Sequence, residues 1–338
     1  MDNQKIIAGY RLLKWILIPL IAATMLICGM WGSSPGDKSA PASGTMLVQA
    51  AVTKPSSVKI MVSKKKSNKV TVKASWSGSA VAYYYNIYYE NEFGWGHMEG
   101  QTNKKSATAT FSHPEGQIRT YGVQVWAYDS SGNYSDESKK TTTFMRKGSY
   151  TNKIQKIINK NIDSSASTFE KIKFAHDWLI KNIDYDTNLK TVSTTLKGTM
   201  KNKEAVCEGY TIAFGVFMKL MKIPVKYVSN SQHSWNMVKL GGKWYNIDVT
   251  WDDPVGLESV TKKFPIYNYF LQSTKCMWGK DGSGYHNFAT DYYPKATSTV
   301  YDNPGGESGY YENLPSGEDD YLQYADTFYP WKNGSPIG

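Results

Sequence analysis

Residues 205–254 read AVCEGYTIAFGVFMKLMKIPVKYVSNSQHSWNMVKLGGKWYNIDVTWDDP, and this stretch decides the fold of the chain around it. Its first part, from Val206 to Met221, places apolar residues three and four positions apart, which is the period of an α-helix. Further apolar residues widen this stripe, and Pro224 ends the pattern. The stretch therefore predicts a helix that is buried on most sides and has Cys207 at its amino end.

The second part of the stretch predicts a β-hairpin. Two runs of strand-forming residues, 233–240 and 243–249, lie on either side of Gly241 and Gly242. A glycine pair between two such runs is typical of a two-residue hairpin turn. We therefore expect two antiparallel strands to follow the helix.

The register of the hairpin decides which side chains meet. A two-residue turn pairs Leu240 with Lys243, and the same register places Trp235 opposite Asp248. Residues two apart share a face of a strand, so His233 lies on the face that carries Asp248, as its diagonal neighbour. A three-residue loop would put these two on opposite faces, because a shift of one residue turns every side chain over.

Cys207, His233 and Asp248 are the candidate catalytic residues. At the start of a helix, unpaired backbone N–H groups and the helix dipole favour a thiolate, and the same N–H groups can hold a developing oxyanion. A thiolate nucleophile, an imidazole base and a carboxylate that orients the imidazole form a set suited to nucleophilic catalysis.

The same residues have other uses. Cys207 could be an inert core thiol, or it could form a disulfide with Cys276. Cysteine, histidine and aspartate also bind metals, but the chain has no closely spaced pair of ligands of the zinc type. We therefore expect neither a metal nor a cofactor at this site.

Several segments resemble the transglutaminase-like superfamily, in the branch common in bacterial surface proteins. They are VCEGYTIAF (206–214) and HSWNMVKLGGKWYNIDVTWDDP (233–254), together with FAHDWLIKNIDYD (174–186), which resembles the helix before the cysteine, and YNYFLQS (267–273), which resembles a later segment. The resemblance covers about residues 169–294.

The resemblance implies a papain-like α+β fold in which Cys207 is the nucleophile, His233 the base and Asp248 the residue that orients the base. The calcium-dependent animal enzymes carry a tryptophan directly after the cysteine, and this chain has Glu208 there. This departure counts against protein cross-linking as the activity, but it does not affect the expectation of thiol chemistry.

The predicted activity is acyl transfer or hydrolysis at carboxamide or amide groups of surface or secreted proteins and peptides. Two alternatives stay open, a cysteine peptidase or amidase of cell-wall peptides and a non-catalytic surface adhesion or scaffold protein. Trp235, Trp244 and Trp251 could form an apolar wall that excludes water, although we expect at least two of them in the core.

The start of the 338-residue chain predicts export. Three basic residues precede an apolar run at 15–31, which is typical of a signal peptide and also long enough for a membrane anchor. We therefore expect residues 1–31 to be a signal peptide or anchor, and the protein to be extracellular or at the cell surface. Residues 32–54 are expected to form a flexible linker. With 3 cysteines, one of them in the export segment, the chain has no disulfide framework.

Residues 55–146 predict an all-β sandwich. Alternating runs occur at 69–76, 84–89, 107–111 and 121–128, and turn-forming clusters occur at 77–78, 94–96, 114–116 and 129–133. YGVQVWAYDSSGNYSDES (121–138) resembles the late strands of a fibronectin type III or immunoglobulin-like module. His97 and His113 stand alone here and are expected at the surface or in turns.

This module is also rich in lysine, within a chain of formal net charge +10. A solvated strand face accounts for such lysines, and attraction to an anionic cell-wall polymer or membrane surface is the functional alternative. Nucleic acid is not an expected partner, because the export signal argues against it and the chain carries no recognition motif.

Residues 147–300 are expected to form the transglutaminase-like catalytic domain. Its first helix falls within 147–161, and its second begins with a capping box at 167–170. His176 on the second helix is expected to pack or to hydrogen-bond rather than to catalyse. Residues 185–203 are expected to form a polar loop that could line the cleft.

The last part of the chain has little periodicity. Beyond Pro254 we expect loops and aromatic residues. His286 could approach the site from this region, but we expect it in a surface role. Residues 301–338 are an acidic tail rich in tyrosine and glycine, which could cover the basic module, close the cleft or stay disordered.

Overall fold

The computed structural model describes residues 51–65, 68–263, 265–280 and 284–302. The predicted export or anchor segment and the tail from residue 303 onward lie outside the described residues. From Thr53 onward, the described residues belong to one compact unit. Within the described part of the chain, none of the helices has the length and apolar content needed to cross a bilayer.

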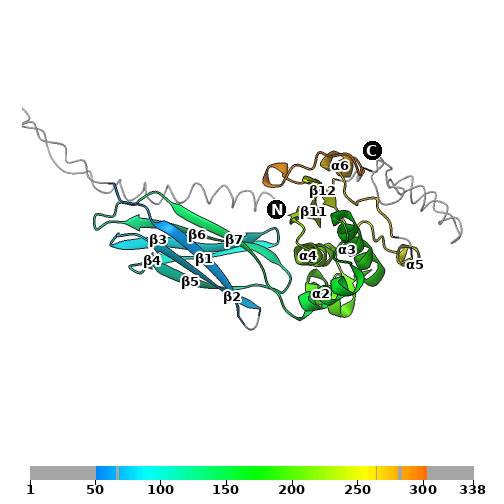
Figure 1. The fold of residues 1–338 in the computed structure, drawn as a ribbon, viewed down its shortest axis with the longest axis horizontal. Helices are drawn as coiled ribbons and strands as arrows, with labels where there is room; N and C mark the ends of the chain where they lie inside the picture. Colours follow the sequence, from blue (N-terminus) through cyan, green and yellow to red (C-terminus); the bar gives the residue numbers. More distant parts are fainter. Residues whose placement is uncertain (1–50, 66–67, 264, 281–283, 303–338) are drawn as a thin grey trace, which may run out of the picture. The chain divides into compact units, whose positions relative to one another are not determined.

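The first part of the unit is built from two antiparallel sheets (Figure 1). One sheet has the strand order β1-β2-β5 and the other has the order β4-β3-β6-β7. The strands are β1 (Ser56–Lys65), β2 (Lys69–Ser77), β3 (Ala82–Asn91), β4 (Gly94–Thr102), β5 (Ser106–Ser112), β6 (Ile118–Tyr128) and β7 (Ser138–Met145). Alternate residues of β2 are buried, as in a sheet with one face on a core. The four predicted strands are confirmed, and β1, β4 and β7 complete the sheets.

The turn predicted at residues 94–96 is wrong. Strand β4 begins at Gly94, and the turn lies at residues 92 and 93. The glycine at 96 serves close packing instead, because a Cβ atom there would lie 2.6 Å from the ring of Tyr89. A glycine in a strand can therefore look like a turn signal when it makes room for a neighbouring ring.

The surface position predicted for His113 is also wrong, whereas His97 is exposed as expected. His113 is fully buried, with Nε2 at 2.8 Å from the carbonyl oxygen of Gln117 and Nδ1 at 2.8 Å from the hydroxyl of Tyr121. Burial lowers the pKa of His113 to about 4, so the ring is neutral at pH 7. His113 is therefore a hydrogen-bonded core residue.

The second part combines helices with a three-stranded sheet. Its main elements are α2 (Ser149–Asn161), α3 (Thr168–Asn182), α4 (Cys207–Leu220) and the strands β10 (Val225–Ser229), β11 (Ser234–Leu240) and β12 (Lys243–Ile247). Shorter elements are β8 (Asp184–Tyr185), η1 (Thr191–Thr194), η2 (Gly198–Asn202), β9 (Glu204–Ala205), α5 (Glu258–Thr261), α6 (Thr274–Lys280) and η3 (Thr290–Tyr292). The capping box predicted at 167–170 opens α3, where Ser167 Oγ accepts from the backbone N–H of Glu170 and the Glu170 carboxylate accepts from that of Ser167.

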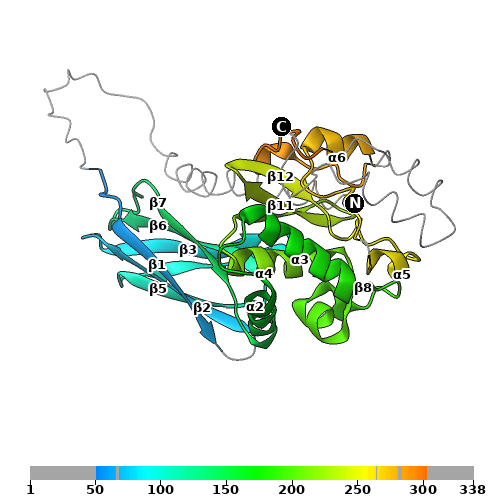
Figure 2. The same cartoon turned by 45° about the vertical axis from the view of Figure 1, so that its right-hand side comes forward.

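Helix α4 lies at the centre of this second part. Helices α2 and α3 pack against it, and strands β10 and β11 contact it as well (Figure 2). Residues 209–218 of α4 are all buried, as the wide apolar stripe predicts. Gly209 allows the closest approach, since a Cβ there would lie 2.2 Å from the carbonyl oxygen of Ser193. The helix that begins at Cys207 is therefore held on nearly every side.

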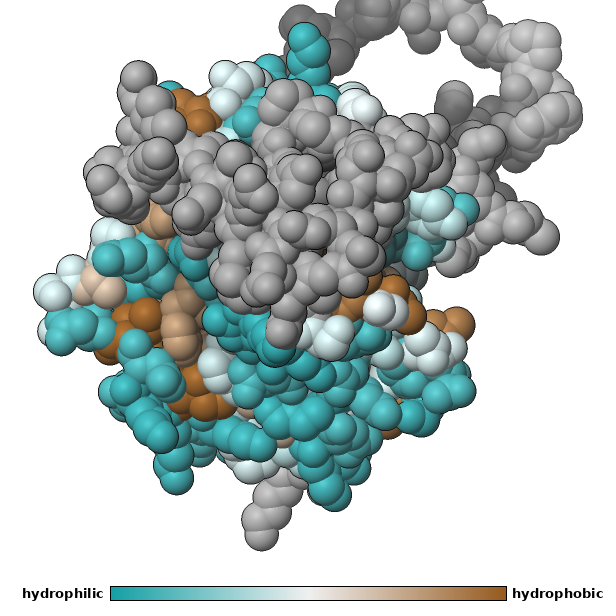
Figure 3. All heavy atoms as spheres, turned by 90° about the vertical axis from the view of Figure 1, so that its right-hand side faces the viewer, coloured by the Kyte–Doolittle hydropathy of each residue, from teal (hydrophilic) through white to brown (hydrophobic). Residues whose placement is uncertain are grey.

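The exterior of this part differs from its core in polarity. On the face shown in Figure 3, the described residues are mostly hydrophilic, with a few apolar side chains between them. The main core includes the helix residues Ile172, Leu179, Phe214 and Phe217 together with Ile247 from the sheet, all fully buried. This burial fixes the two elements that carry the candidate site.

Candidate functional site

The hairpin register is the one predicted. Leu240 pairs with Lys243, and Asn236 pairs with Ile247. Gly241 and Gly242 have φ angles of 55° and 82°, which suits a two-residue turn with both central residues in the left-handed region. His233 directly precedes β11 and Asp248 directly follows β12, so the two side chains emerge at the same end of the hairpin.

His233 and Asp248 are joined directly. Nε2 of His233 hydrogen-bonds Oδ2 of Asp248, and both side chains are buried. Because Nε2 is engaged in this way, Nδ1 is the ring nitrogen left to face the thiol. The predicted contact between imidazole and carboxylate is therefore present.

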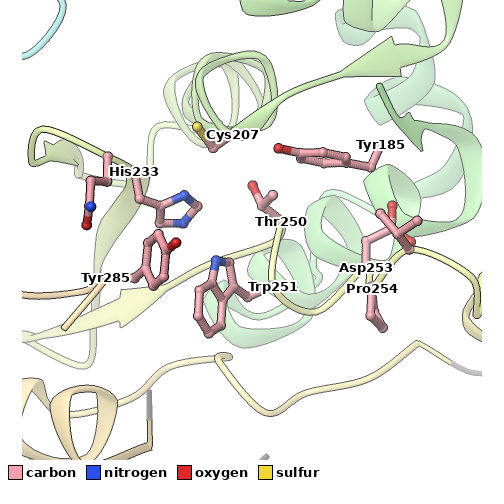
Figure 4. Close-up of a pocket in the computed structure, with 10 residues that line it drawn as sticks. Tyr185, Cys207, His233, Thr250, Trp251, Asp253, Pro254 and Tyr285 are labelled. Carbon is pink, nitrogen blue, oxygen red and sulfur yellow. The ribbon is translucent and has the colours of Figure 1, made fainter. Parts of the chain in front are cut away.

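Cys207 is the first residue of α4, next to an N-cap, Val206, whose side chain makes no capping hydrogen bond. Figure 4 shows the Cys207 sulfur and the His233 ring on the same side of a pocket. Burial acts to raise the pKa of the Cys207 thiol, but the hydrogen bond and charge of His233 outweigh it and hold that pKa below its ordinary value. Ser234 adds to the same effect.

The charge state of the pair follows from Asp248. Burial acts to lower the pKa of His233, but the charge and hydrogen bond of Asp248 raise it to about 10. The pKa of Asp248 is depressed, because the charge and hydrogen bond of His233 outweigh its burial. Together these shifts favour a thiolate beside an imidazolium, with an ionised carboxylate behind it.

The carboxylate of Asp248 has further partners. Oδ1 accepts from the backbone N–H groups of Thr250 at 2.9 Å and Trp251 at 3.3 Å. Oδ2 also lies 2.9 Å from Nε2 of His286. The surface role predicted for His286 is wrong, since its side chain is fully buried. The sequence around His286 has no periodicity that could have placed it here.

A pocket of about 330 Å³ opens beside the thiol. It is lined by Tyr185, Cys207, Gln232, His233, Thr250, Trp251, Asp253, Pro254, Val255 and Tyr285. Of the three tryptophans considered from the sequence, Trp251 lines the pocket, Trp235 is in the core and Trp244 packs partly buried against it. The Cys207 side chain is therefore part of the pocket wall.

Tyr185 belongs to the segment that was expected to line the cleft. Strand β8 pairs in parallel with β9, and this pairing sets Tyr185 beside Ala205, two residues before Cys207. The hydroxyl of Tyr185 points into the pocket on the side of the thiol (Figure 4). Burial raises the pKa of this phenol, and negative charge on Cys207 raises it further. Tyr185 therefore presents a protonated hydroxyl close to the sulfur.

Asp253 supplies a carboxyl group to the pocket wall. Its Oδ2 accepts a hydrogen bond of 2.6 Å from the hydroxyl of Tyr210, and its Oδ1 accepts one of 3.3 Å from Thr261. Burial raises the pKa of Asp253 to about 7. Both oxygens are thus engaged within the protein, which ties α4 to the loop after Asp248.

Cys207 and Cys276 are both free thiols, so the disulfide between them is not formed. The Cys276 thiol donates to Oε1 of Gln272 at 3.1 Å.

The sequence showed no close pair of metal ligands, but the fold gathers His233, Asp248 and His286 from three segments, with ligand atoms within 4.8 Å of one another. This set could hold a metal ion.

His176 has the packing role predicted for it. It is fully buried on α3, and its ring stacks on Tyr267 with centroids 5.1 Å apart. Its two nitrogens lie 3.0 Å from Asp177 and 3.1 Å from Asp252. The residue therefore belongs to a buried ionic network and not to the pocket wall.

A cysteine at the start of a helix, facing a histidine–aspartate pair on an adjoining sheet, is the arrangement of a cysteine-based enzyme. Residues 155–249 match the family model of the transglutaminase-like superfamily. Among curated proteins, none matched the chain.

Solved structures similar to this chain include one described as a TGase, with 18% identity, a TM-score of 0.27, and coverage of 30% of this chain and 32% of that one. The chain thus spans about a third of that structure's length. A protein from Cytophaga hutchinsonii, described provisionally as a cysteine protease, has 12% identity, a TM-score of 0.27, and coverage of 54% and 75%. The similar structures also include the fibronectin type III domain of human collagen alpha-1(XX), with 17% identity, a TM-score of 0.22, and coverage of 32% of this chain and 95% of that one.

Proposed function

We propose that this protein is a thiol enzyme that transfers or hydrolyses acyl groups of protein or peptide carboxamides, with Cys207 as nucleophile. The observation that carries the proposal is the Cys207 thiol at the start of α4, with its pKa held low by His233, which Asp248 holds in turn. A papain-like arrangement, with the nucleophile on the helix and its two helpers on the sheet, supports the same conclusion.

The first half of the reaction forms a thioester. The Cys207 thiolate attacks the carbonyl carbon of the substrate, and the electron pair of the C=O bond moves to the oxygen. Backbone N–H groups at the start of α4 and the hydroxyl of Tyr185 hold that oxyanion. The C–N bond then breaks, and the imidazolium of His233 gives its proton to the departing amine or ammonia.

The second half releases the acyl group. Water or an amine attacks the thioester while neutral His233 takes a proton from it, and the thiolate leaves. Asp248 keeps the imidazole in one tautomer and orientation through both halves. Attack by water gives hydrolysis, and attack by a lysine or another primary amine gives a new amide bond. The ring of Trp251 on the pocket wall favours the amine to the extent that it excludes water.

An amine-incorporation assay tests the proposal. The purified protein is incubated with a glutamine-containing peptide, with and without a primary amine, and the products are identified by mass spectrometry. Ammonia release or amine incorporation that disappears in Cys207→Ala supports acyl transfer at carboxamides. Cleavage of the peptide chain, also dependent on Cys207, supports the second candidate, a peptidase or amidase. Equal behaviour of wild type and Cys207→Ala in all these assays would favour the non-catalytic scaffold.

We also propose that the enzyme acts at the cell surface, where residues 1–31 serve as export signal or anchor. Exposed lysines of the sandwich, such as Lys64, Lys73 and Lys140, support attraction to an anionic wall polymer or lipid surface. Such binding weakens with salt, because exposed charges are screened. Sedimentation with anionic vesicles at low and high salt, and protease access to the protein on whole cells, test these two points.

A further inference from the structure

Asp248 binds a second imidazole besides that of His233. Nε2 of His286 lies 2.9 Å from the same oxygen, Oδ2, that meets Nε2 of His233. The two imidazole rings lie edge to face, with centroids 5.4 Å apart. Because an ionised carboxylate only accepts hydrogen bonds, the Nε2 atom of each histidine must carry a proton.

The carboxylate of Asp248 is saturated as a result. Oδ1 accepts from the backbone N–H groups of Thr250 and Trp251, and Oδ2 accepts from His233 and His286. Two donors on each oxygen fix the rotation of the carboxylate in a buried site, where such bonds reinforce one another. A carboxylate fixed in this way fixes the ring of His233.

The side chain of Asn230 ties the two histidines together from another direction. Its Oδ1 accepts from the backbone N–H of His233 at 2.8 Å. Its Nδ2 donates to the backbone carbonyls of Tyr285 and Asn287, the two neighbours of His286. The carbonyl of His286 itself accepts a 2.8 Å hydrogen bond from Nε1 of Trp278. The segment 285–287 is thus held at three consecutive residues.

Aromatic rings enclose the imidazole of His286. Ring centroids of Trp251, Tyr269 and Trp235 lie 4.7, 5.1 and 5.2 Å away. The titratable groups that face the ring include Asp248, His233 and the phenol of Tyr269. Tyr285, the residue before His286, lines the pocket. The segment 285–287 therefore contributes both a hydrogen-bond donor to Asp248, through His286, and a side chain to the pocket wall, through Tyr285.

The distances favour hydrogen bonding over metal coordination in this cluster. In a tetrahedral zinc site with bonds of about 2.0–2.1 Å, neighbouring ligand atoms stand about 3.3 Å apart. The 2.9 Å between His286 and Asp248 is an ordinary hydrogen-bond length. As it stands, the cluster is a hydrogen-bonded network.

We propose that His286 is a positioning residue, whose N–H holds the Asp248 carboxylate so that His233 stays aligned with the Cys207 thiol. The inference rests on the function proposed above and adds a fourth member to its site. His286 acts through Asp248 and His233, by donating a hydrogen bond, and not by exchanging a proton with the substrate.

The test compares His286→Gln with His286→Phe in the full-length protein. Glutamine can still donate an N–H to Asp248 but cannot titrate, whereas phenylalanine fills the place of the ring and donates nothing. The rate constant for alkylation of Cys207 by iodoacetamide is measured across pH, with and without EDTA, by mass spectrometry of the Cys207 peptide. Thermal melts check that each variant is folded.

We expect the midpoint of the pH–rate profile to be the same in wild type and His286→Gln. In His286→Phe the midpoint should rise by about one pH unit and the rate below it should fall about ten-fold, which is the scale of one hydrogen bond to a charged group. Phe288→Leu is the matched control. Phe288 packs on Trp235, as His286 does, with ring centroids 5.6 Å apart, so its loss should leave the midpoint unchanged.

Three outcomes would overturn the proposal. A His286→Phe midpoint equal to that of wild type would make His286 a packing residue. A His286→Gln profile like that of His286→Phe would mean that the imidazole, and not its N–H, is required. A wild-type rate that falls on adding EDTA would make the cluster a metal site. Alkylation needs no acyl substrate, so a failure of the amine-incorporation assay would leave this result standing.

Discussion

Nε2 of His176 lies 3.1 Å from Oδ2 of Asp252, and both side chains are fully buried. This contact joins α3 to the loop that follows Asp248, because the backbone N–H of Asp252 donates to the carbonyl of Asp248 at 3.3 Å. The other ring nitrogen of His176 lies 3.0 Å from Asp177. A network outside the pocket thus supports Asp248, the hydrogen-bond partner of His233.

This network predicts a pH-dependent stability. Burial acts to lower the pKa of His176, but hydrogen bonds and charges of Asp177 and Asp252 raise it above its ordinary value. A raised pKa contributes stability that is fully present below the unfolded value of about 6.5 and is lost as pH rises through the folded value. His176→Gln should therefore cost about 3 kcal/mol near pH 6 and less at higher pH. Urea unfolding at pH 6 and pH 9 measures this, and an equal cost at both would contradict it.

Tyr185→Phe tests the hydroxyl assigned to the oxyanion. The hydroxyl points into the pocket on the side of the thiol, and its loss should lower kcat in the amine-incorporation assay about ten- to a hundred-fold. The alkylation rate of Cys207 should change little, since that reaction forms no oxyanion. A variant with unchanged kcat would remove Tyr185 from the mechanism.

Asp248→Asn should narrow the pH range of activity. The charge and hydrogen bond of Asp248 raise the pKa of His233 to about 10, so removing that charge lets the imidazolium lose its proton at lower pH. We expect kcat/KM to fall at least about a hundred-fold, and its alkaline limb to move down. The measurement is kcat/KM against pH for both proteins. An alkaline limb that stays in place would speak against control by Asp248.

Gly209→Ala should disturb the start of α4, which carries Cys207, through packing alone. A Cβ atom at Gly209 would lie 2.2 Å from the carbonyl oxygen of Ser193, which is backbone and cannot rotate away. Overpacking of this kind costs about 1–3 kcal/mol. Chemical denaturation of the variant measures the loss. Gly279→Ala is the control, because nothing lies within 4 Å of a Cβ built there.

Local patterns were enough to predict the elements that carry the candidate site. The apolar period from Val206 to Met221 predicted α4, and the glycine pair set the register that brings His233 to Asp248. The capping box at 167–170 predicted the start of α3. Each of these signals depends only on residues that are close together in the chain, so it can be recognised from one sequence.

Contacts between distant segments were not predictable in the same way. His286 reaches Asp248 across 38 positions, from a segment without periodicity, and its burial depends on rings supplied by other loops. His113 also looked like an isolated polar residue, but it follows the end of β5 and meets Tyr121 on β6. The glycines of β4 looked like a turn because glycine is favoured both in turns and where a ring packs closely on the backbone.

The pH dependence of Cys207 alkylation by iodoacetamide, with Cys276 as internal reference and His233→Asn as comparison, tests the central claim most directly. His233 holds the pKa of the Cys207 thiol below its ordinary value, so the midpoint for Cys207 should lie below pH 8.5 and Cys207 should react faster than Cys276. Its midpoint should rise in His233→Asn. A Cys207 midpoint near pH 8.5 that does not change in His233→Asn would contradict the account.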